Sequence, residues 1–154
     1  MKTLLTSLLF IIIGITAYGQ KQDNKIHIVK NEKPILIINN EIIASADILN
    51  KIPAENILKL DVLKESELSS IKLFSTEKPN NGIIKVDINF KLNVKTQKEL
   101  NMFFGLDESN NIYVNRYLIE DKRQSILTES ITKIELIKAD NIFLKKASLN
   151  ITIE

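Results

Sequence analysis

The chain contains no cysteine and no tryptophan, and only one histidine and four glycines among its 154 residues. Without cysteine, neither disulfides nor thiolate ligands can hold the fold together, so its stability must come from packing. A zinc site is unexpected, because it would need three or four suitable ligands close together. Four glycines provide no glycine-rich phosphate-binding loop. We therefore predict no metal site, no cofactor and no cofactor-binding residues.

The first twenty residues, "MKTLLTSLLFIIIGITAYGQ", have the layout of a secretory signal peptide. Lys2 precedes an uncharged apolar stretch from Leu4 to Ala17, and the small-x-small ending predicts cleavage after Gly19. The alternative is an uncleaved membrane anchor, but the uncharged stretch is shorter than the ~20 residues that a spanning helix needs. We expect an exported protein, periplasmic or extracellular, with no membrane span after cleavage.

The sequence also lacks an excess of charge of either sign. Loss of residues 1–19 would leave 20 basic and 19 acidic residues, a formal net charge of +1. A nearly neutral chain gives no electrostatic reason to bind nucleic acid or an anionic membrane surface. About 135 residues would remain, enough for one domain with a hydrophobic core.

Aliphatic residues are abundant, and the predominance of Ile predicts a strand-rich interior. After a polar segment over 20–33, the run "PILII" over 34–38 is continuously apolar, as expected for a strand covered on both faces. Asn39-Asn40 predicts a turn. Ser45 is expected to cap a short helix that Pro53 ends.

Two later segments alternate between apolar and polar residues, which predicts strands with one buried face. Leu58, Leu60 and Val62 alternate with Lys59 and Asp61, so we expect the three apolar side chains to face the core. From Ile84 to Val94 every second residue is apolar, which predicts a single long strand of roughly 36 Å.

Residues 96–104 predict a helix between the two parts of the chain. Thr96 and Glu99 form a capping box, and Gly105 is placed to end the helix. Leu100, Phe103 and Phe104 make its apolar face. Together with Tyr113 and Tyr117, the two Phe residues could instead build an exposed aromatic patch for a partner, and core packing explains them equally well.

The chain also repeats itself. "IINNEII" over 37–43 matches "YVNRYLI" at an offset of 76, "ILKLDVLK" over 57–64 matches "ITKIELIK" at 74, and "GIIKVDI" over 82–88 matches "ASLNITI" at 65. The repeated unit would be strand, turn, short helix, strand, linker and strand. Chance similarity between Ile-rich strands is the alternative interpretation.

Residues 34–88 resemble the plug domain of TonB-dependent outer-membrane receptors of the Bacteroidota type, and 112–153 form a weaker echo. Two blocks carry the resemblance: Pro53, Ile57, Leu60, Val62, Leu63 and Lys64, then Asn81, Gly82, Ile83, Ile84 and Val86. Phe74-Ser75 stands where these plugs usually have Tyr-Gly. The strands of a transmembrane barrel would need hundreds of further residues. The resemblance therefore implies a small, freestanding, exported plug-like protein without transport activity.

No residue type or spacing supports catalysis, and we predict no catalytic residue and no enzyme activity. The single histidine, His27, is expected in a short edge strand. The first ligand positions of a calcium-binding loop are matched by Asp107, Ser109 and Asn111. Ile112 replaces the required glycine, so we expect a simple turn. Glu65 and Glu67 lie two residues apart on an expected helix and point to different sides.

We therefore expect one α+β domain over 34–154, with a mixed sheet built from two degenerate plug-like halves, 34–94 and 110–154. The leading functional hypothesis is a non-enzymatic interaction or accessory module of the bacterial cell envelope. It would bind a cell-envelope protein through sheet edges or the "STEKPNNG" loop over 75–82. The alternative is a periplasmic domain that binds or senses a small ligand in a pocket between the halves. The sequence does not specify an oligomeric state.

Overall fold

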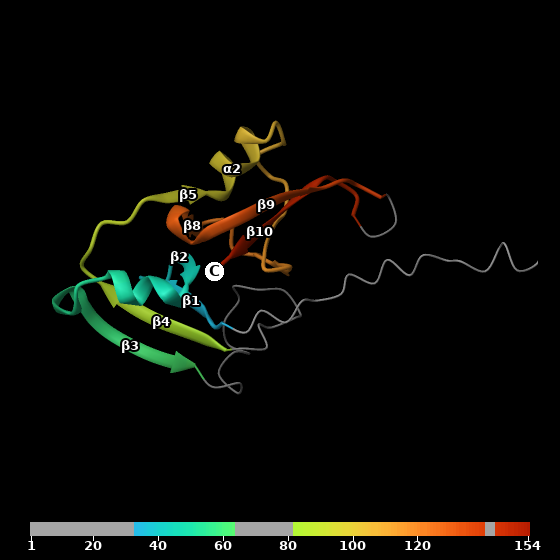
Figure 1. Cartoon of the computed structure of the whole chain (residues 1–154). Coiled ribbons are helices and arrows are strands. Elements are labelled where there is room, and N and C mark those ends of the chain that lie inside the picture. Colours follow the sequence, from blue (N-terminus) through green and yellow to red (C-terminus); the bar gives the residue numbers. More distant parts are fainter. Residues whose placement is uncertain (1–32, 64–81, 141–143) are drawn as a thin grey trace, which may run out of the picture.

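The computed structural model describes residues 33–63, 82–140 and 144–154 (Figure 1). The predicted signal peptide, the strand around His27 and the helix around Glu65 lie outside the described residues, as does most of the 75–82 loop. Within the described ranges, no helix has both the length and the apolar character needed to cross a membrane.

The described chain alternates short strands with short helical turns. The first half contains β1 (Ile35–Ile38), β2 (Ile42–Ser45), the 3-10 turns η1 (Ala46–Lys51) and η2 (Ala54–Asn56), β3 (Ile57–Leu63) and β4 (Ile83–Ile88). A link with β5 (Val94–Thr96) and the helix α2 (Gln97–Phe103) follows. The second half contains β6 (Ile112–Val114), β7 (Tyr117–Leu118), β8 (Ser125–Leu127), the 3-10 turn η4 (Thr128–Ser130), β9 (Ile131–Ile137) and β10 (Ser148–Ile153).

The α+β class with mixed strands and short helices is confirmed, but the strands form two sheets rather than one. The six-stranded sheet has the order β3-β4-β1-β2-β8-β5, and the four-stranded sheet has the order β7-β6-β10-β9. Each half has an apolar sheet face, and stacking the two faces buries both, which a single continuous sheet would not do.

Two hydrophobic clusters account for the burial. The larger lies between the sheets and joins side chains of both halves, among them Ile37, Ile43, Val114 and Ile151. The smaller covers the other face of the six-stranded sheet, where η1 places Ile48 and Ile52 over Leu36 and Val86. Because β1 is covered on both faces, all four of its residues are buried, as the run "ILII" predicts.

The predicted internal repeat is confirmed by the strand order. β1, β2, β4 and β3 correspond to β6, β7, β10 and β9, and both groups have the same neighbours with the same parallel or antiparallel direction. The hairpin turns correspond as well, because Asn39-Asn40 and Asn115-Arg116 all have positive φ. The repeated unit thus contains a two-stranded hairpin where the sequence indicated one strand and a turn.

The pairing register repeats residue by residue. Leu60 lies opposite Val86 in the first half, and Ile134 lies opposite Ile151 in the second, which are the positions given by offsets of 74 and 65. Both antiparallel ladders also have an irregularity at their start, where a 3-10 turn leads into the strand. Such agreement does not follow from similar composition, because a one-residue slip would turn every side chain to the opposite face.

The predicted long strand over 84–94 is wrong. β4 ends at Ile88, and β5 lies at the opposite edge of the same sheet. β4 has lost its neighbours by that point, because β1 ends at Ile38 and β3 begins at Ile57. Alternation of apolar residues continues through 89–94, but it does not indicate where the neighbouring strands end.

The predicted direction of β3 is also wrong, since Leu58, Leu60 and Val62 are exposed rather than buried. Leu60 lies on the same face as Val86, to which it is paired, but the smaller cluster stops at β4 and at the first residue of β3. β3 is the edge strand, and no described element packs over the middle of it.

Candidate interaction surface

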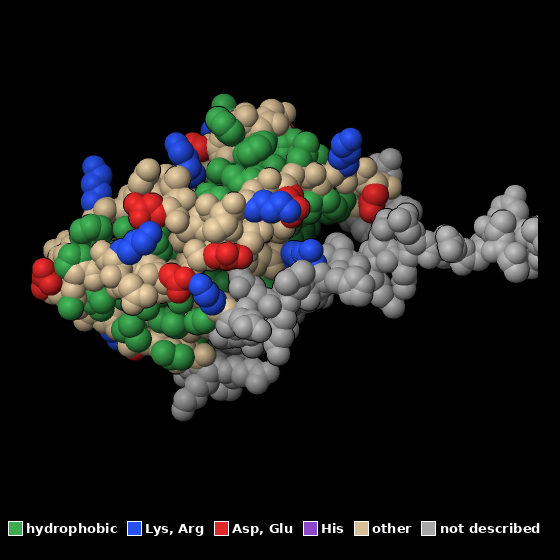
Figure 2. All heavy atoms as spheres, viewed as in Figure 1, with side chains coloured by type: hydrophobic (Ala, Val, Ile, Leu, Met, Phe, Trp, Pro, Cys, Tyr) green, Lys and Arg blue, Asp and Glu red, His purple; other side chains and the backbone are tan. Residues whose placement is uncertain are grey.

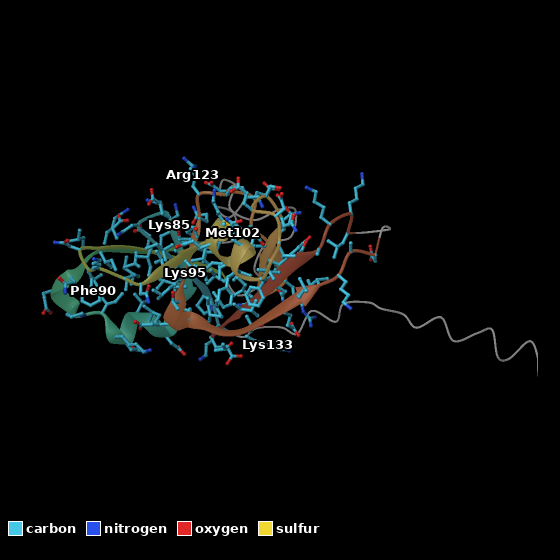
Figure 3. All side chains as sticks on the ribbon, turned by 90° about the horizontal axis from the view of Figure 1, so that it is seen from above. Lys85, Phe90, Lys95, Met102, Arg123 and Lys133 are labelled. Atoms are coloured by element: carbon cyan, nitrogen blue, oxygen red, sulfur yellow. The ribbon has the colours of Figure 1, made fainter. Side chains whose placement is uncertain are left out.

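Three large apolar side chains lie on the surface at the C-terminal end of α2: Met102, Phe103 and Phe104, which we call the α2 tip. Their exposed fractions are 60%, 83% and 37%. The rings of Phe103 and Phe104 meet edge to face with centroids 5.2 Å apart. Hydrophobic atoms gather at the top of Figure 2, where Figure 1 places α2, and Met102 lies near the centre of the view from above in Figure 3. A contiguous exposed apolar group of this kind typically marks an interaction site.

Both ends of α2 are fixed, so the tip is held on a rigid support. At the N-terminus, the Glu99 N–H donates to Thr96 Oγ1 over 3.1 Å, and the Thr96 N–H donates to Glu99 Oε2 over 2.8 Å. This is the predicted capping box. At the C-terminus, Gly105 has a φ of +70°, and the Leu106 N–H donates to the Asn101 carbonyl over 2.9 Å. Gly105 therefore ends the helix as expected.

Polar anchors, rather than the aromatic residues, set the buried face of α2. Gln97 and Asn101 are buried, and their side-chain amides donate to the carbonyls of Asp121 over 2.8 Å and Asn110 over 2.9 Å. Phe103 follows Asn101 by two residues and so lies about 200° around the helix from it. The predicted apolar face is wrong in this respect, because Leu100 is buried whereas Phe103 is not.

A second exposed apolar surface runs along β3. Leu58, Leu60 and Val62, which we call the β3 stripe, are 68%, 46% and 66% exposed. β3 lies at the lower left of Figure 1, where Figure 2 also shows hydrophobic atoms. Lys59 and Asp61 form an ion pair on the opposite face of the strand. Among the described strands only β4 pairs with β3, so the backbone groups at its other edge have no strand partner within the described residues.

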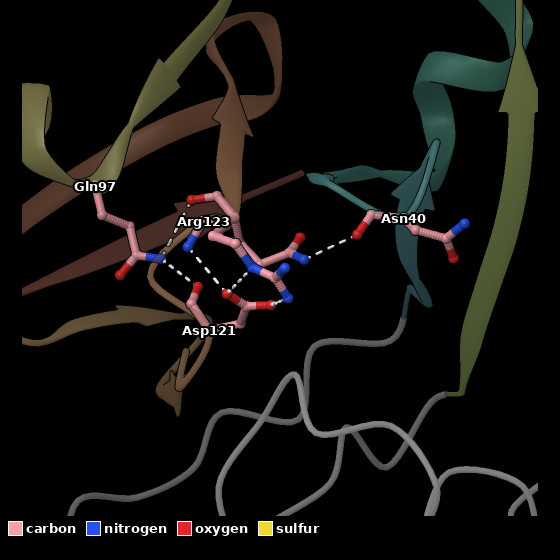
Figure 4. Close-up of polar contacts among 5 residues, drawn as sticks. Asn40, Gln97, Asp121 and Arg123 are labelled. Atoms are coloured by element: carbon pink, nitrogen blue, oxygen red, sulfur yellow. Dashed lines mark hydrogen bonds and ion pairs between the residues drawn. The ribbon is translucent and has the colours of Figure 1, made fainter.

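A buried amide network links α2 to the hairpin of the first half (Figure 4). The Gln97 amide donates to the carbonyls of Asp121 and Gln124, and the Gln124 amide donates to the Asn40 carbonyl over 2.9 Å. Gln97 and Gln124 are buried, and their Oε1 atoms have no hydrogen-bond partner among the described residues. The network ties three segments together and explains why α2 is held in place.

An ion pair lies beside this network. Arg123 donates from its terminal nitrogen to Asp121 Oδ2 over 2.7 Å and from Nε to Oδ1 over 3.0 Å. These bonds lower the pKa of Asp121 to about 2 and raise the pKa of Arg123. Both groups are therefore held in their charged forms at neutral pH, which suits a structural contact and not a proton transfer.

Nearby, Lys122 donates to the Asn110 carbonyl over 3.1 Å, and partial burial lowers its pKa. Within the described part of the chain, no group of three His, Asp or Glu side chains could hold a metal ion. The Ser109 N–H donates to Asp107 Oδ1 over 2.9 Å, and the Asn110 N–H donates to the Asp107 carbonyl over 3.0 Å, so the chain turns at the predicted position. Hydrogen bonds from Ser109 also lower the pKa of Asp107. His27, Glu65 and Glu67 lie outside the described residues.

The structure brings together only half of the predicted aromatic patch. Phe103 and Phe104 are in contact and exposed, whereas Tyr113 and Tyr117 are half-buried on β6 and β7. Met102, which sequence reasoning missed, completes the exposed group. Met102 follows Asn101 by one residue, so its exposure could be predicted only if the buried hydrogen bonds of Asn101 were already known.

The larger hydrophobic cluster lies between the halves, in the region where the alternative hypothesis places a ligand pocket. Comparison of the chain with protein-family models, with curated proteins and with solved structures finds no match in any of the three. The resemblance to TonB plug domains therefore stays a prediction from residues 34–88.

Proposed function

We propose that this protein is an exported, non-enzymatic module of the bacterial cell envelope that binds another envelope protein through the α2 tip. The observation that carries the proposal is the 83% exposure of Phe103 on a helix fixed at both ends. Aromatic side chains and Met are enriched at protein interfaces, and a rigid anchor loses little conformational entropy on binding. The layout of residues 1–20 supports export.

The partner surface would be an apolar pocket that accepts Phe103, with Met102 and Phe104 at its rim. Burial of a Phe side chain contributes roughly 1.5–3 kcal/mol, so loss of this ring would weaken binding by at least tenfold. The tip itself bears no charge, and the charged residues Lys98 and Glu99 of α2 are paired with Glu108 and Lys95. Binding should therefore depend only weakly on salt.

A photo-crosslinking amino acid at position 103, introduced into the full chain in its native cells, tests the proposal. The expected result is one reproducible adduct with an envelope protein, which disappears when Met102 and Phe104 are both replaced by Ser. The matched control places the same probe at Glu55, an exposed position on η2 in the first half of the chain. Identical adducts from both positions, or none from position 103, would contradict the proposal.

A further inference from the structure

β3 forms an edge of the six-stranded sheet, and no described strand pairs with its outer side. In the parallel pair of β1 with β4, the N–H groups of Ile35 and Asn39 donate to the carbonyls of Gly82 and Val86. Even-numbered residues of β4 thus direct their backbone groups toward β1, and odd-numbered residues direct theirs toward β3. The odd-numbered residues of β4 lie opposite Lys59, Asp61 and Leu63. Leu60 and Val62 therefore direct their N–H and C=O groups outward, whereas Leu58 lies in the register irregularity between Ile57 and Lys59.

The charged face of the same strands carries an alternating pattern. Lys59 lies opposite Asp87 on β4, and Asp61 lies opposite Lys85. Lys59 also pairs with Asp61 along β3, and these contacts raise the pKa of Lys59. Opposite charges facing each other across a ladder stabilise it, and like charges destabilise it. Any strand added to this edge should therefore bring an acid opposite Lys59 and a base opposite Asp61.

A second copy of β3 meets that requirement. When two copies run antiparallel about Leu60, Lys59 of each faces Asp61 of the other, and Leu58 of each faces Val62 of the other. The charge pattern then alternates without interruption from β4 of one copy to β4 of the other. The central Leu60 pair has outward backbone groups on both copies, so its two residues can exchange both of their N–H···O=C hydrogen bonds.

We propose that the protein forms a twofold symmetric dimer in which two β3 strands pair antiparallel about Leu60. The pairing joins the two β3 stripes into one apolar surface and removes an unpaired, apolar edge that would otherwise promote aggregation. A twofold contact uses the same surface on both copies and closes on itself, so assembly stops at two.

The equivalent edge strand β9 does not offer the same match. Thr132 replaces Leu58 by the repeat offset, and the neighbours of Lys133 and Glu135 on β10 are the uncharged Thr152 and Asn150. Ile134 is half-buried, so β9 has a smaller apolar surface than β3. Pairing of β3 with β9 of another copy would also leave free edges at both ends and extend into chains of molecules.

Charge reversal tests the register. In the proposed dimer, residue 59 of each copy faces residue 61 of the other. Lys59→Asp therefore places two acids opposite each other, and Asp61→Lys places two bases opposite each other. Each variant should weaken the dimer by about tenfold or more. An equimolar mixture should restore it, because the acids of one variant then face the bases of the other. Lys133→Asp on β9 is the matched control and should leave dimerisation unchanged.

The measurement is sedimentation velocity over a range of concentrations. The sample is the protein as it is purified from the cells that export it. Unfolding midpoints of all variants establish that the monomers remain folded. A monomer at every soluble concentration would overturn the proposal. A dimer that both variants leave intact would also overturn it. Growth into a series of larger species would do so as well, because that is the result expected when β3 of one copy pairs with β9 of another.

The absence of native cysteine permits a second test that does not rely on charge. Only the residue on the twofold axis meets its own copy, so Leu60→Cys should be linked into dimers by a short thiol cross-linker. Leu58→Cys alone should link poorly, and a mixture of Leu58→Cys with Val62→Cys should link well. Equal linking by all single variants would contradict the register. The α2 tip lies on another part of the molecule, so a monomeric result would leave its proposed role untouched.

Discussion

Asn39 and Asn115 make the same pair of hydrogen bonds at equivalent places in the two halves. Asn39 Oδ1 accepts from the Ile88 N–H over 2.8 Å, and its amide donates to the Ile88 carbonyl over 3.2 Å. Asn115 makes these bonds to Ile153 over 2.9 and 3.4 Å. Both residues have positive φ, 51° and 49°. In each half, this Asn forms the hairpin turn and also binds the last residue of the parallel strand beside it, β4 in the first half and β10 in the second.

Replacement of Asn39 by Ala should lower the free energy of unfolding by about 2–3 kcal/mol. The change leaves the Ile88 N–H without its partner and puts a Cβ-bearing residue that has no local hydrogen bond into the left-handed region. Asn39→Gly removes only the hydrogen bonds and should cost about 1–2 kcal/mol. Urea unfolding measures both values.

The corresponding changes at Asn115 should give the same order, with Ala more costly than Gly. Asn89→Ala is the control, since Asn89 is exposed, is absent from the positive-φ residues and should cost less than about 0.5 kcal/mol. Equal effects of Ala and Gly at both turns would show that the backbone conformation contributes nothing.

Ser130 joins the two halves through one buried hydrogen bond. The Ser45 N–H donates to Ser130 Oγ over 3.0 Å, and both residues are buried. Ser130→Ala should cost about 1–3 kcal/mol, because the Ser45 N–H cannot find water in its place. Ser109→Ala, at an exposed turn, is the matched control and should change the free energy of unfolding by less than about 0.5 kcal/mol. Similar small effects at both positions would contradict the assignment.

The Asp121–Arg123 ion pair predicts a specific acid dependence. Arg123 lowers the pKa of Asp121 in the folded protein to about 2, whereas an unfolded Asp has a pKa of about 3.9. The stabilisation is therefore fully present above about pH 4 and is lost as the pH falls toward 2. Asp121→Asn should reduce the slope of unfolding free energy against pH within this window.

Arg123→Gln should also flatten that slope, but to a smaller extent. The variant keeps the backbone N–H of residue 123, which donates to Asp121 Oδ1 over 3.0 Å. Urea unfolding at closely spaced pH values between 2 and 5 measures the slopes. If the wild type and Asp121→Asn keep parallel curves across the window, the carboxylate is not favoured by folding.

Local signals in the sequence predict local structure well here. Ser45 caps η1, Thr96 with Glu99 caps α2, and Asn39 forms a turn, because each feature depends on atoms only a few residues apart. The repeat was also predictable, since the offsets of three short segments locate all four shared strands.

Features that depend on distant segments could not be predicted in this way. The end of β4 depends on where β1 and β3 end, and the exposure of Phe103 depends on carbonyls that Gln97 and Asn101 reach beyond α2. The candidate site was thus foreseen only as one of two alternatives for Phe103 and Phe104. The β3 stripe was missed, because an apolar alternation is identical in an edge strand and in a covered one.

The corrected direction of β3 gives a prediction that separates these two cases. Val62 and Val86 lie on neighbouring strands, but Val62 is 66% exposed and Val86 is 1% exposed. Thr has nearly the shape of Val and adds a hydroxyl, which is costly only where it is buried. The comparison belongs in the Lys59→Asp background, where the proposed dimer is weakened and does not cover Val62. There, Val62→Thr should change the free energy of unfolding by less than about 0.5 kcal/mol, and Val86→Thr should lower it by about 1–3 kcal/mol. Comparable losses at both positions in urea unfolding would mean that the β3 stripe is covered within a single chain, and no apolar surface would then remain at this edge for a second copy.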